Sequence, residues 1–103
     1  MSVVVIATIT PKPEHADEVR QAVQETVPAV HEESGCERYS LHQGRDGALV
    51  MVEKWESPEA LATHGRAEPL STLSGKLEGK LAGPPSVTVL DALPAGDPAK
   101  GAL

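Results

Sequence analysis

Two segments of the sequence, residues 2–10 and 48–56, are predicted strands that are apolar on both faces. Both are rich in β-branched and other apolar side chains. Successive side chains of a strand point to opposite faces, so Val3 and Val5 face one way and Val4 faces the other. Helices of the same chain can cover only one face of such a sheet. A second copy of the chain can cover the other, and we therefore expect a homodimer.

The remaining segments alternate helical and strand patterns in the order β-α-β-β-α-β. Apolar residues at steps of three and four predict helices, and Ser57 followed by Pro58 is typical of a helix start. Pro28 predicts a kink or an early stop inside the first helix. The predicted elements after the first strand are a helix over 13–34 that ends at Gly35, strands over 36–43 and 48–56, a short helix from Ser57 to about His64, a helical stripe from Pro69 to Leu81, and a strand over 86–93. This order predicts a ferredoxin-like α+β domain with an antiparallel four-stranded sheet.

Composition limits the domain organisation and the classes of partner. A chain of 103 residues is one domain, which we place at residues 1–93, and residues 94–103 are a tail rich in Pro, Gly and Ala. The net charge of -6 and the presence of only two aromatic residues argue against nucleic acid and anionic membranes as partners. The apolar N-terminal segment is too short to span a bilayer, and Cys36 has no second cysteine to pair with, so we expect a cytoplasmic protein.

Four residues are candidates for a functional site: Tyr39, Glu53, Trp55 and His64. Trp55 ends a strand and His64 follows about two helical turns later, so both can lie at the same end of the sheet. Trp55 is equally compatible with a place in the core, and His64 with a helix end exposed to solvent. Glu53 shares a strand face with Trp55, where a structural salt bridge to Arg38 or to a residue across the dimer is favoured over a role as general base.

The other polar residues do not form a recognisable motif. His15, His31, His42 and His64 show no close metal-ligand spacing, so we expect no metal site. The sequence contains no glycine-rich phosphate loop and no G-x-S-x-G nucleophile motif. We therefore expect no bound cofactor. Tyr39 is placed on the strand next to Glu53, where it can contact a phenolic ligand or pack in the core.

The segments HEESGCERYSLHQ and LVMVEKWESPEALATH resemble the antibiotic biosynthesis monooxygenase family of dimeric α+β barrel proteins. The resemblance covers roughly residues 3–92. It rests on Gly35 and Cys36, on Tyr39, on the Glu53-x-Trp55 step and on the segment from Ser57 to His64. It implies the dimeric barrel, and it places Trp55 and His64 near a pocket.

The resemblance also implies a reaction class. Some family members oxidise anthrones or quinols with O2 and without metal or flavin, and others degrade haem with the help of an Asn. This sequence has no Asn, so it departs from the haem-degrading pattern and lacks a full match to the anthrone enzymes. The resemblance implies a cofactor-independent monooxygenase that acts on a small aromatic substrate and O2, with His64 as the base that removes the phenolic proton and Trp55 and Tyr39 holding the ring. The alternative is a non-catalytic dimer that binds a small ligand or serves as a stress-related accessory protein.

Overall fold

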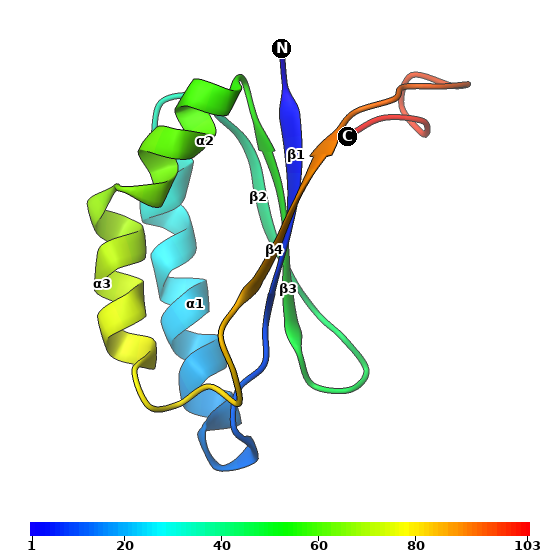
Figure 1. Ribbon diagram of the computed structural model, residues 1–103. Helices are drawn as coiled ribbons and strands as arrows, with labels where there is room; N and C mark the ends of the chain where they lie inside the picture. Colours follow the sequence, from blue (N-terminus) through cyan, green and yellow to red (C-terminus); the bar gives the residue numbers. More distant parts are fainter.

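The computed structural model describes all 103 residues as a four-stranded antiparallel sheet with helices on one face (Figure 1). The elements in chain order are β1 (Val3–Ile9), the 3₁₀ helix η1 (Pro13–His15), α1 (Ala16–His31), β2 (Cys36–Gln43), β3 (Leu49–Trp55), α2 (Pro58–Gly65), α3 (Glu68–Leu77) and β4 (Ser86–Asp91). The strand order is β2-β3-β1-β4. The predicted ferredoxin-like α+β fold is therefore confirmed. None of the helices has the length and apolar character needed to cross a membrane.

Two helix boundaries differ from the prediction. The helix expected over residues 13–34 begins with the turn η1 and ends at His31, and α1 continues past Pro28 instead of stopping there. Pro28 lies on the solvent-exposed side in the last part of the helix, where the loss of one backbone hydrogen bond costs least. The helix predicted from the apolar stripe up to Leu81 is α3, and it ends at Leu77. The backbone turns at Gly79, which has a φ of 77°. Leu81 instead forms a β-bridge with Pro11.

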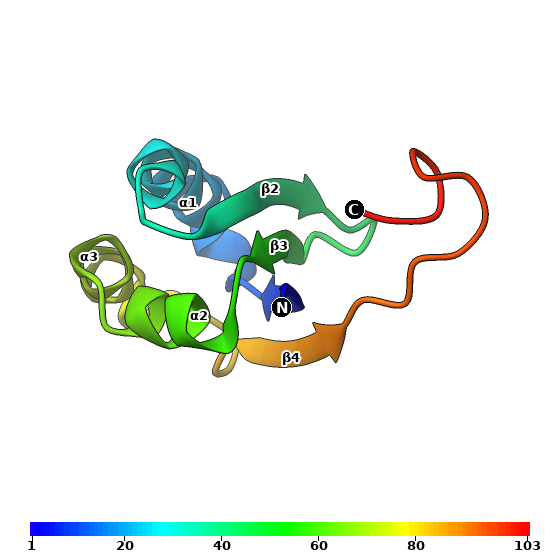
Figure 2. The same ribbon diagram turned by 90° about the horizontal axis from the view of Figure 1, so that it is seen from above.

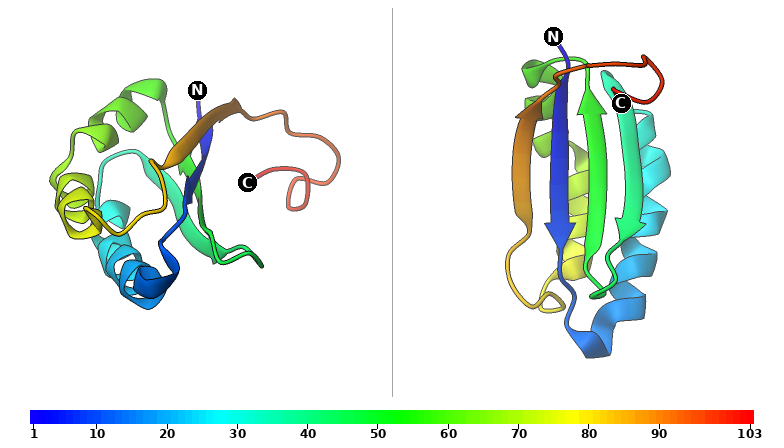
Figure 3. Two further views of the ribbon diagram at one scale, coloured as in Figure 1. Left: turned by 60° about the horizontal axis from the view of Figure 1, so that its bottom comes forward. Right: turned by 90° about the vertical axis from the view of Figure 1, so that its right-hand side faces the viewer.

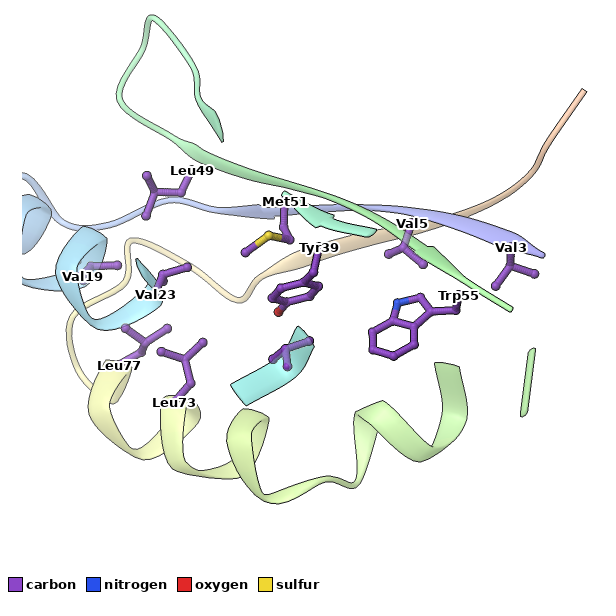
Figure 4. Close-up of a cluster of buried hydrophobic side chains, with 11 residues drawn as sticks. Val3, Val5, Val19, Val23, Tyr39, Leu49, Met51, Trp55, Leu73 and Leu77 are labelled. Atoms are coloured by element: carbon purple, nitrogen blue, oxygen red, sulfur yellow. The ribbon is translucent and has the colours of Figure 1, made fainter. Parts of the chain in front are cut away.

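The core lies between the helices and one face of the sheet (Figure 4). It consists of eleven buried side chains: Val3, Val5, Val19, Val23, Val30, Tyr39, Leu49, Met51, Trp55, Leu73 and Leu77. The core residues of β3 occupy every second or fourth position of the strand, as expected of side chains that share one face. Figure 4 shows Tyr39 and Trp55 projecting from the sheet toward the helices. The core is thus mainly aliphatic, with both aromatic residues at one end.

The opposite face of the sheet carries no helix (Figure 3). Its central residues are apolar, as the alternation predicted: Val4, Ile6, Val50, Val52 and Leu90. Strand β4 is exposed along its whole length, and Val87 and Val89 remain 61% and 55% exposed on the helix side of the sheet. The chain therefore presents two apolar surfaces that its own helices leave uncovered. The homodimer stays a prediction.

Residues 94–103 form neither helix nor strand. The chain extends beyond β4 and turns back on the side of the sheet away from the helices (Figure 2). Hydrogen bonds close this turn between Ala95 and Gly101, and the Lys54 side chain donates to the backbone oxygen of Leu103 at 2.9 Å. The division into a domain of residues 1–93 and a separate tail stays a prediction.

The loop before β2 is packed closely against the start of α2, and Gly35 permits this approach. Gly35 has a φ of 86°, and a Cβ at this position would lie 2.6 Å from the Cβ of Ala60. The Gly35 carbonyl also accepts a hydrogen bond from the Glu56 amide at 2.9 Å. Glycine is needed here both for backbone conformation and for space.

We predict that Gly35→Ala destabilises the protein by about 2 to 4 kcal/mol, because left-handed backbone strain and overpacking against Ala60 add together. Gly47→Ala is the matched control, since Gly47 has a φ of 93° but no atom within 4 Å of the added Cβ. It should cost only about 1 to 2 kcal/mol. Urea unfolding of both variants measures the difference, and equal losses would contradict the close packing at Gly35.

Candidate functional site

A cavity of about 310 Å³ lies between the helix-covered face of the sheet and helices α2 and α3. Most of its lining is apolar, and no Lys or Arg borders it. The apolar lining includes Val5, Ala7, Ile9 and Met51 from the sheet and Leu61, Leu70, Leu73 and Leu77 from the helices. The polar groups of Tyr39, Glu53, His64 and Ser74 also border the cavity. A mostly apolar cavity with a few polar groups is typical of a site for a small organic ligand.

Strand register and a short connection bring the candidate residues together. Tyr39 on β2 pairs with Glu53 on β3, so their side chains share the face of the sheet that the helices cover. Only two residues separate Trp55 from α2, and Ser57 caps this helix by accepting a hydrogen bond from the Ala60 amide at 3.1 Å. Helix α2 therefore starts directly above the end of β3.

His64 is the buried residue of α2 and is only 4% exposed. Its ring stacks on Trp55 with 4.5 Å between ring centroids and 29° between planes. The ring of Tyr39 meets it edge-on at 5.4 Å. Two aromatic side chains thus hold the imidazole at the border of the cavity, and the alternative of a solvent-exposed histidine is wrong.

Trp55 is fully buried, and it is not among the residues that line the cavity. The expectation that it holds the substrate ring directly therefore needs correction, because its ring stacks on His64 and it is His64 that borders the cavity. Its indole Nε1 donates a hydrogen bond to Glu53 Oε1 at 2.9 Å. The salt bridge expected between Glu53 and Arg38 is wrong, since Arg38 lies opposite Lys54 in the strand register, on the other face of the sheet. A salt bridge from Glu53 to a partner subunit stays a prediction.

Glu33 belongs to the same cluster and was not among the residues predicted from the sequence. Its Oε1 lies 2.9 Å from His64 Nδ1, and the two side chains are only 14% and 5% exposed. The other carboxylate oxygen, Oε2, is buried without a hydrogen-bond partner. Glu33 lies in the loop that Gly35 packs against α2, so the close packing of this loop brings the carboxylate to the imidazole.

Burial and neighbouring charges shift the pKa values of two groups in the cluster. Burial raises the pKa of Glu53, although the Trp55 hydrogen bond and the His64 charge oppose the shift. The pKa of Tyr39 is raised well above its ordinary value, first by burial and then by the Glu53 and Glu33 charges. The Tyr39 hydroxyl therefore stays protonated and can donate a hydrogen bond toward the cavity.

The cluster does not have the composition of a metal centre. No group of three or more His, Cys, Asp or Glu side chains in the structure is arranged to hold a metal ion. The thiol of Cys36 lies near the cluster, and burial raises its pKa, followed by the effects of the Glu33 and Glu53 charges. A thiol in this state is a poor ligand and a poor nucleophile. The expected absence of a metal and of a cofactor stays a prediction.

Comparisons with known proteins give consistent results. The profile of the family described as antibiotic biosynthesis monooxygenase matches residues 2–72. Similar solved structures include Rv0793 from Mycobacterium tuberculosis, with 28% identity, a TM-score of 0.86 and coverage of 94% of this chain and 100% of that chain. PA3566 from Pseudomonas aeruginosa has 31% identity, a TM-score of 0.82 and coverage of 89% and 94%. A structure described as an antibiotic biosynthesis monooxygenase has 29% identity, a TM-score of 0.82 and coverage of 89% and 99%. The search of curated proteins gave no match.

We predict that Glu53→Gln stabilises the protein at pH 8. Burial raises the pKa of Glu53, so the folded state binds its proton more tightly than the unfolded state. Stability should therefore fall as the pH rises from the ordinary carboxyl value of 4.5 through the raised pKa, and then level off. A glutamine keeps an oxygen that can accept from Trp55 Nε1 but has no proton to lose, so this decline should disappear.

Thermal unfolding across pH 4 to 9 measures this effect. Glu25→Gln is the control, since it removes the same charge from an exposed position on α1. At pH 8 Glu53→Gln should raise the unfolding temperature more than Glu25→Gln does. At pH 4 this difference between the two variants should be absent. A variant less stable than the parent at pH 8 would contradict the prediction.

Proposed function

Because the chain belongs to the antibiotic biosynthesis monooxygenase family, we propose that it is a cofactor-independent monooxygenase acting on a quinol, anthrone or related electron-rich aromatic substrate. The observation that carries this proposal is a mostly apolar cavity with one buried imidazole, His64, at its border. Oxidation of such a ring by O2 needs removal of a proton and exclusion of water. The cavity and His64 are suited to these two tasks.

In the proposed reaction His64 takes the acidic proton of the bound ring. The electron-rich anion then passes an electron to O2, and the two radicals combine into a peroxide anion. This anion takes the proton back from His64 and becomes a hydroperoxide, which returns His64 to its neutral form. With an anthrone, the reacting carbon gives up two hydrogen atoms and gains one oxygen atom as a carbonyl. The second oxygen atom leaves as water together with these two hydrogen atoms, so that atoms and electrons balance.

The other groups of the cavity would orient the substrate. The protonated Tyr39 hydroxyl can donate to an oxygen of the ring, and Glu53 borders the same space. The absence of Lys and Arg from the lining favours an uncharged ring over one that carries carboxylate or phosphate groups. Trp55 would act from behind His64 by holding the imidazole in place, since it does not border the cavity.

We also propose that the active form is a homodimer in the cytoplasm, in which the helix-free faces of two sheets pack together. The support is the row of apolar residues on that face, where Ile6 and Val52 are paired in the middle of the two central strands and are only partly buried. No helix covers this face (Figure 3). An apolar surface of this kind is costly to expose to water. Two sheets packed face to face remove it from solvent.

We predict that the purified protein consumes O2 with at least one member of a panel of quinols and anthrones, and that His64→Gln lowers the rate by about a hundredfold or more. His15→Gln is the matched control, because His15 lies in η1, outside the sheet, and does not border the cavity. An oxygen electrode gives the rates. If aromatic ligands bind in the cavity and no O2 is consumed, the oxygenase proposal is wrong and the alternative of a non-catalytic ligand-binding dimer takes its place.

We predict that light scattering gives twice the chain mass for the parent protein at micromolar concentration, and that Val52→Asp shifts it to the monomer. A buried charge at the centre of the interface has no partner and opposes association. Gln21→Asp, on the exposed side of α1, adds the same charge outside the interface and should leave the dimer intact. Circular dichroism checks that both variants are folded. A monomeric parent would contradict the proposed dimer.

A further inference from the structure

The contact between Glu33 and His64 joins two segments that are 31 residues apart and otherwise lie in different elements. Glu33 follows the end of α1, and His64 is in the last turn of α2. The distance of 2.9 Å from Oε1 to Nδ1 is that of a well-formed hydrogen bond between a nitrogen and an oxygen. Both side chains are largely removed from solvent, so water weakens this contact little.

This contact determines which nitrogen of His64 carries the hydrogen. An ionised carboxylate can only accept hydrogen bonds, so Nδ1 must donate to it. In the neutral ring Nε2 then keeps its lone pair. Nε2 makes no hydrogen bond with a protein group. Among the side-chain nitrogen and oxygen atoms, only Glu33 Oε2 is both fully buried and without a hydrogen-bond partner, so Nε2 is not fully buried. Nε2 therefore retains accessible surface, and His64 borders the cavity.

We infer that Glu33 is the positioning residue of this site, which holds His64 with its hydrogen on Nδ1 and its free Nε2 available to a ligand in the cavity. Its role in turnover rests on the proposed oxygenase function. When Nε2 takes a proton from the substrate, the ring becomes an imidazolium, and the Glu33 carboxylate stabilises this charge. The stacked Trp55 ring keeps the imidazole plane from turning during the transfer.

A purely structural tie between the loop and α2 would not require this pair. The Gly35 carbonyl already binds the Glu56 amide, and His31 Nε2 lies 2.9 Å from the Tyr39 carbonyl, which ties the end of α1 to β2. The carboxylate adds a cost, because one of its oxygens is buried without a partner. Buried polar groups that remain unsatisfied are a recurring feature of functional sites.

Long-range ¹H–¹⁵N spectra of the imidazole rings test the inference without any assay of activity. The spectra are recorded on the labelled full chain at a pH where the ring is neutral, and His64→Gln assigns the signals. We expect the parent to show Nδ1 protonated and Nε2 unprotonated. Glu33→Gln should lose this preference, because an amide can donate as well as accept. Glu32→Gln, which removes the same charge from the exposed neighbouring residue, should keep it.

Kinetics with a substrate from the oxygen-uptake panel provide the second measurement. Glu33→Gln should lower kcat by about ten- to a hundredfold, as is usual for a residue that orients a reacting group. KM should stay within about twofold, since Glu33 does not border the cavity. Glu32→Gln should change neither constant.

Three results would each overturn the inference. The first is a parent ring protonated on Nε2, and the second is a Glu33→Gln spectrum identical to that of Glu32→Gln. The third is an active enzyme whose kcat is unchanged in Glu33→Gln. If no substrate is oxidised but the spectra show the expected protonation of His64 and its loss in Glu33→Gln, the positioning role stands and only the oxygenase proposal fails.

Discussion

Glu53 places a carboxylate on the core face of a central strand, and the polar end of the core is arranged around it. Strand β3 lies between β2 and β1, so neighbouring strands and helices shield this side chain from water. A carboxylate in such a place must be hydrogen-bonded or take up a proton. Trp55, two residues along the same face, supplies the hydrogen bond. The orientation that this bond gives the indole creates the surface on which His64 stacks.

The polar cluster makes the cavity chemically asymmetric. Tyr39, Glu53 and His64 form one polar group, and mostly apolar side chains from β1, β3 and α3 line the rest, with Ser74 on α3 as the exception. The proposed aromatic substrate would enter such a space with its hydroxyl groups toward the cluster. The asymmetry arises from the strand alternation, because β3 places Met51 and Glu53 on the same face at successive positions. Orientation of the ligand is therefore a consequence of the fold.

The fold was predictable because its signals are local. The apolar residues on both faces of β1 and β3, the Ser57 cap and the glycine after the first helix depend on short stretches of sequence, and the structure has all three features. The cluster of Tyr39, Trp55 and His64 was predicted in part, since strand pairing and a short connection limit where those residues can lie. Glu33 was missed because the predicted helix was extended over residues 13–34, where Glu33 is one of several acidic residues. Its contact with His64 depends on the packing of a loop, and no local pattern indicates which of two adjacent glutamates turns inward.

Reactivity and stability place opposite demands on this end of the core. A carboxylate with a raised pKa and a buried oxygen without a partner both disfavour the folded state, and they lie within one small cluster. The rest of the core is aliphatic and well buried, and the packing of Gly35 against Ala60 and the Ser57 cap stabilise the elements that carry the cluster. The polar groups of the cluster come from different elements: Tyr39 from β2, Glu53 from β3, Glu33 from the loop before β2, and His64 from α2. The cluster therefore exists only in the complete tertiary structure, and its geometry is as rigid as the packing of α2 onto the sheet.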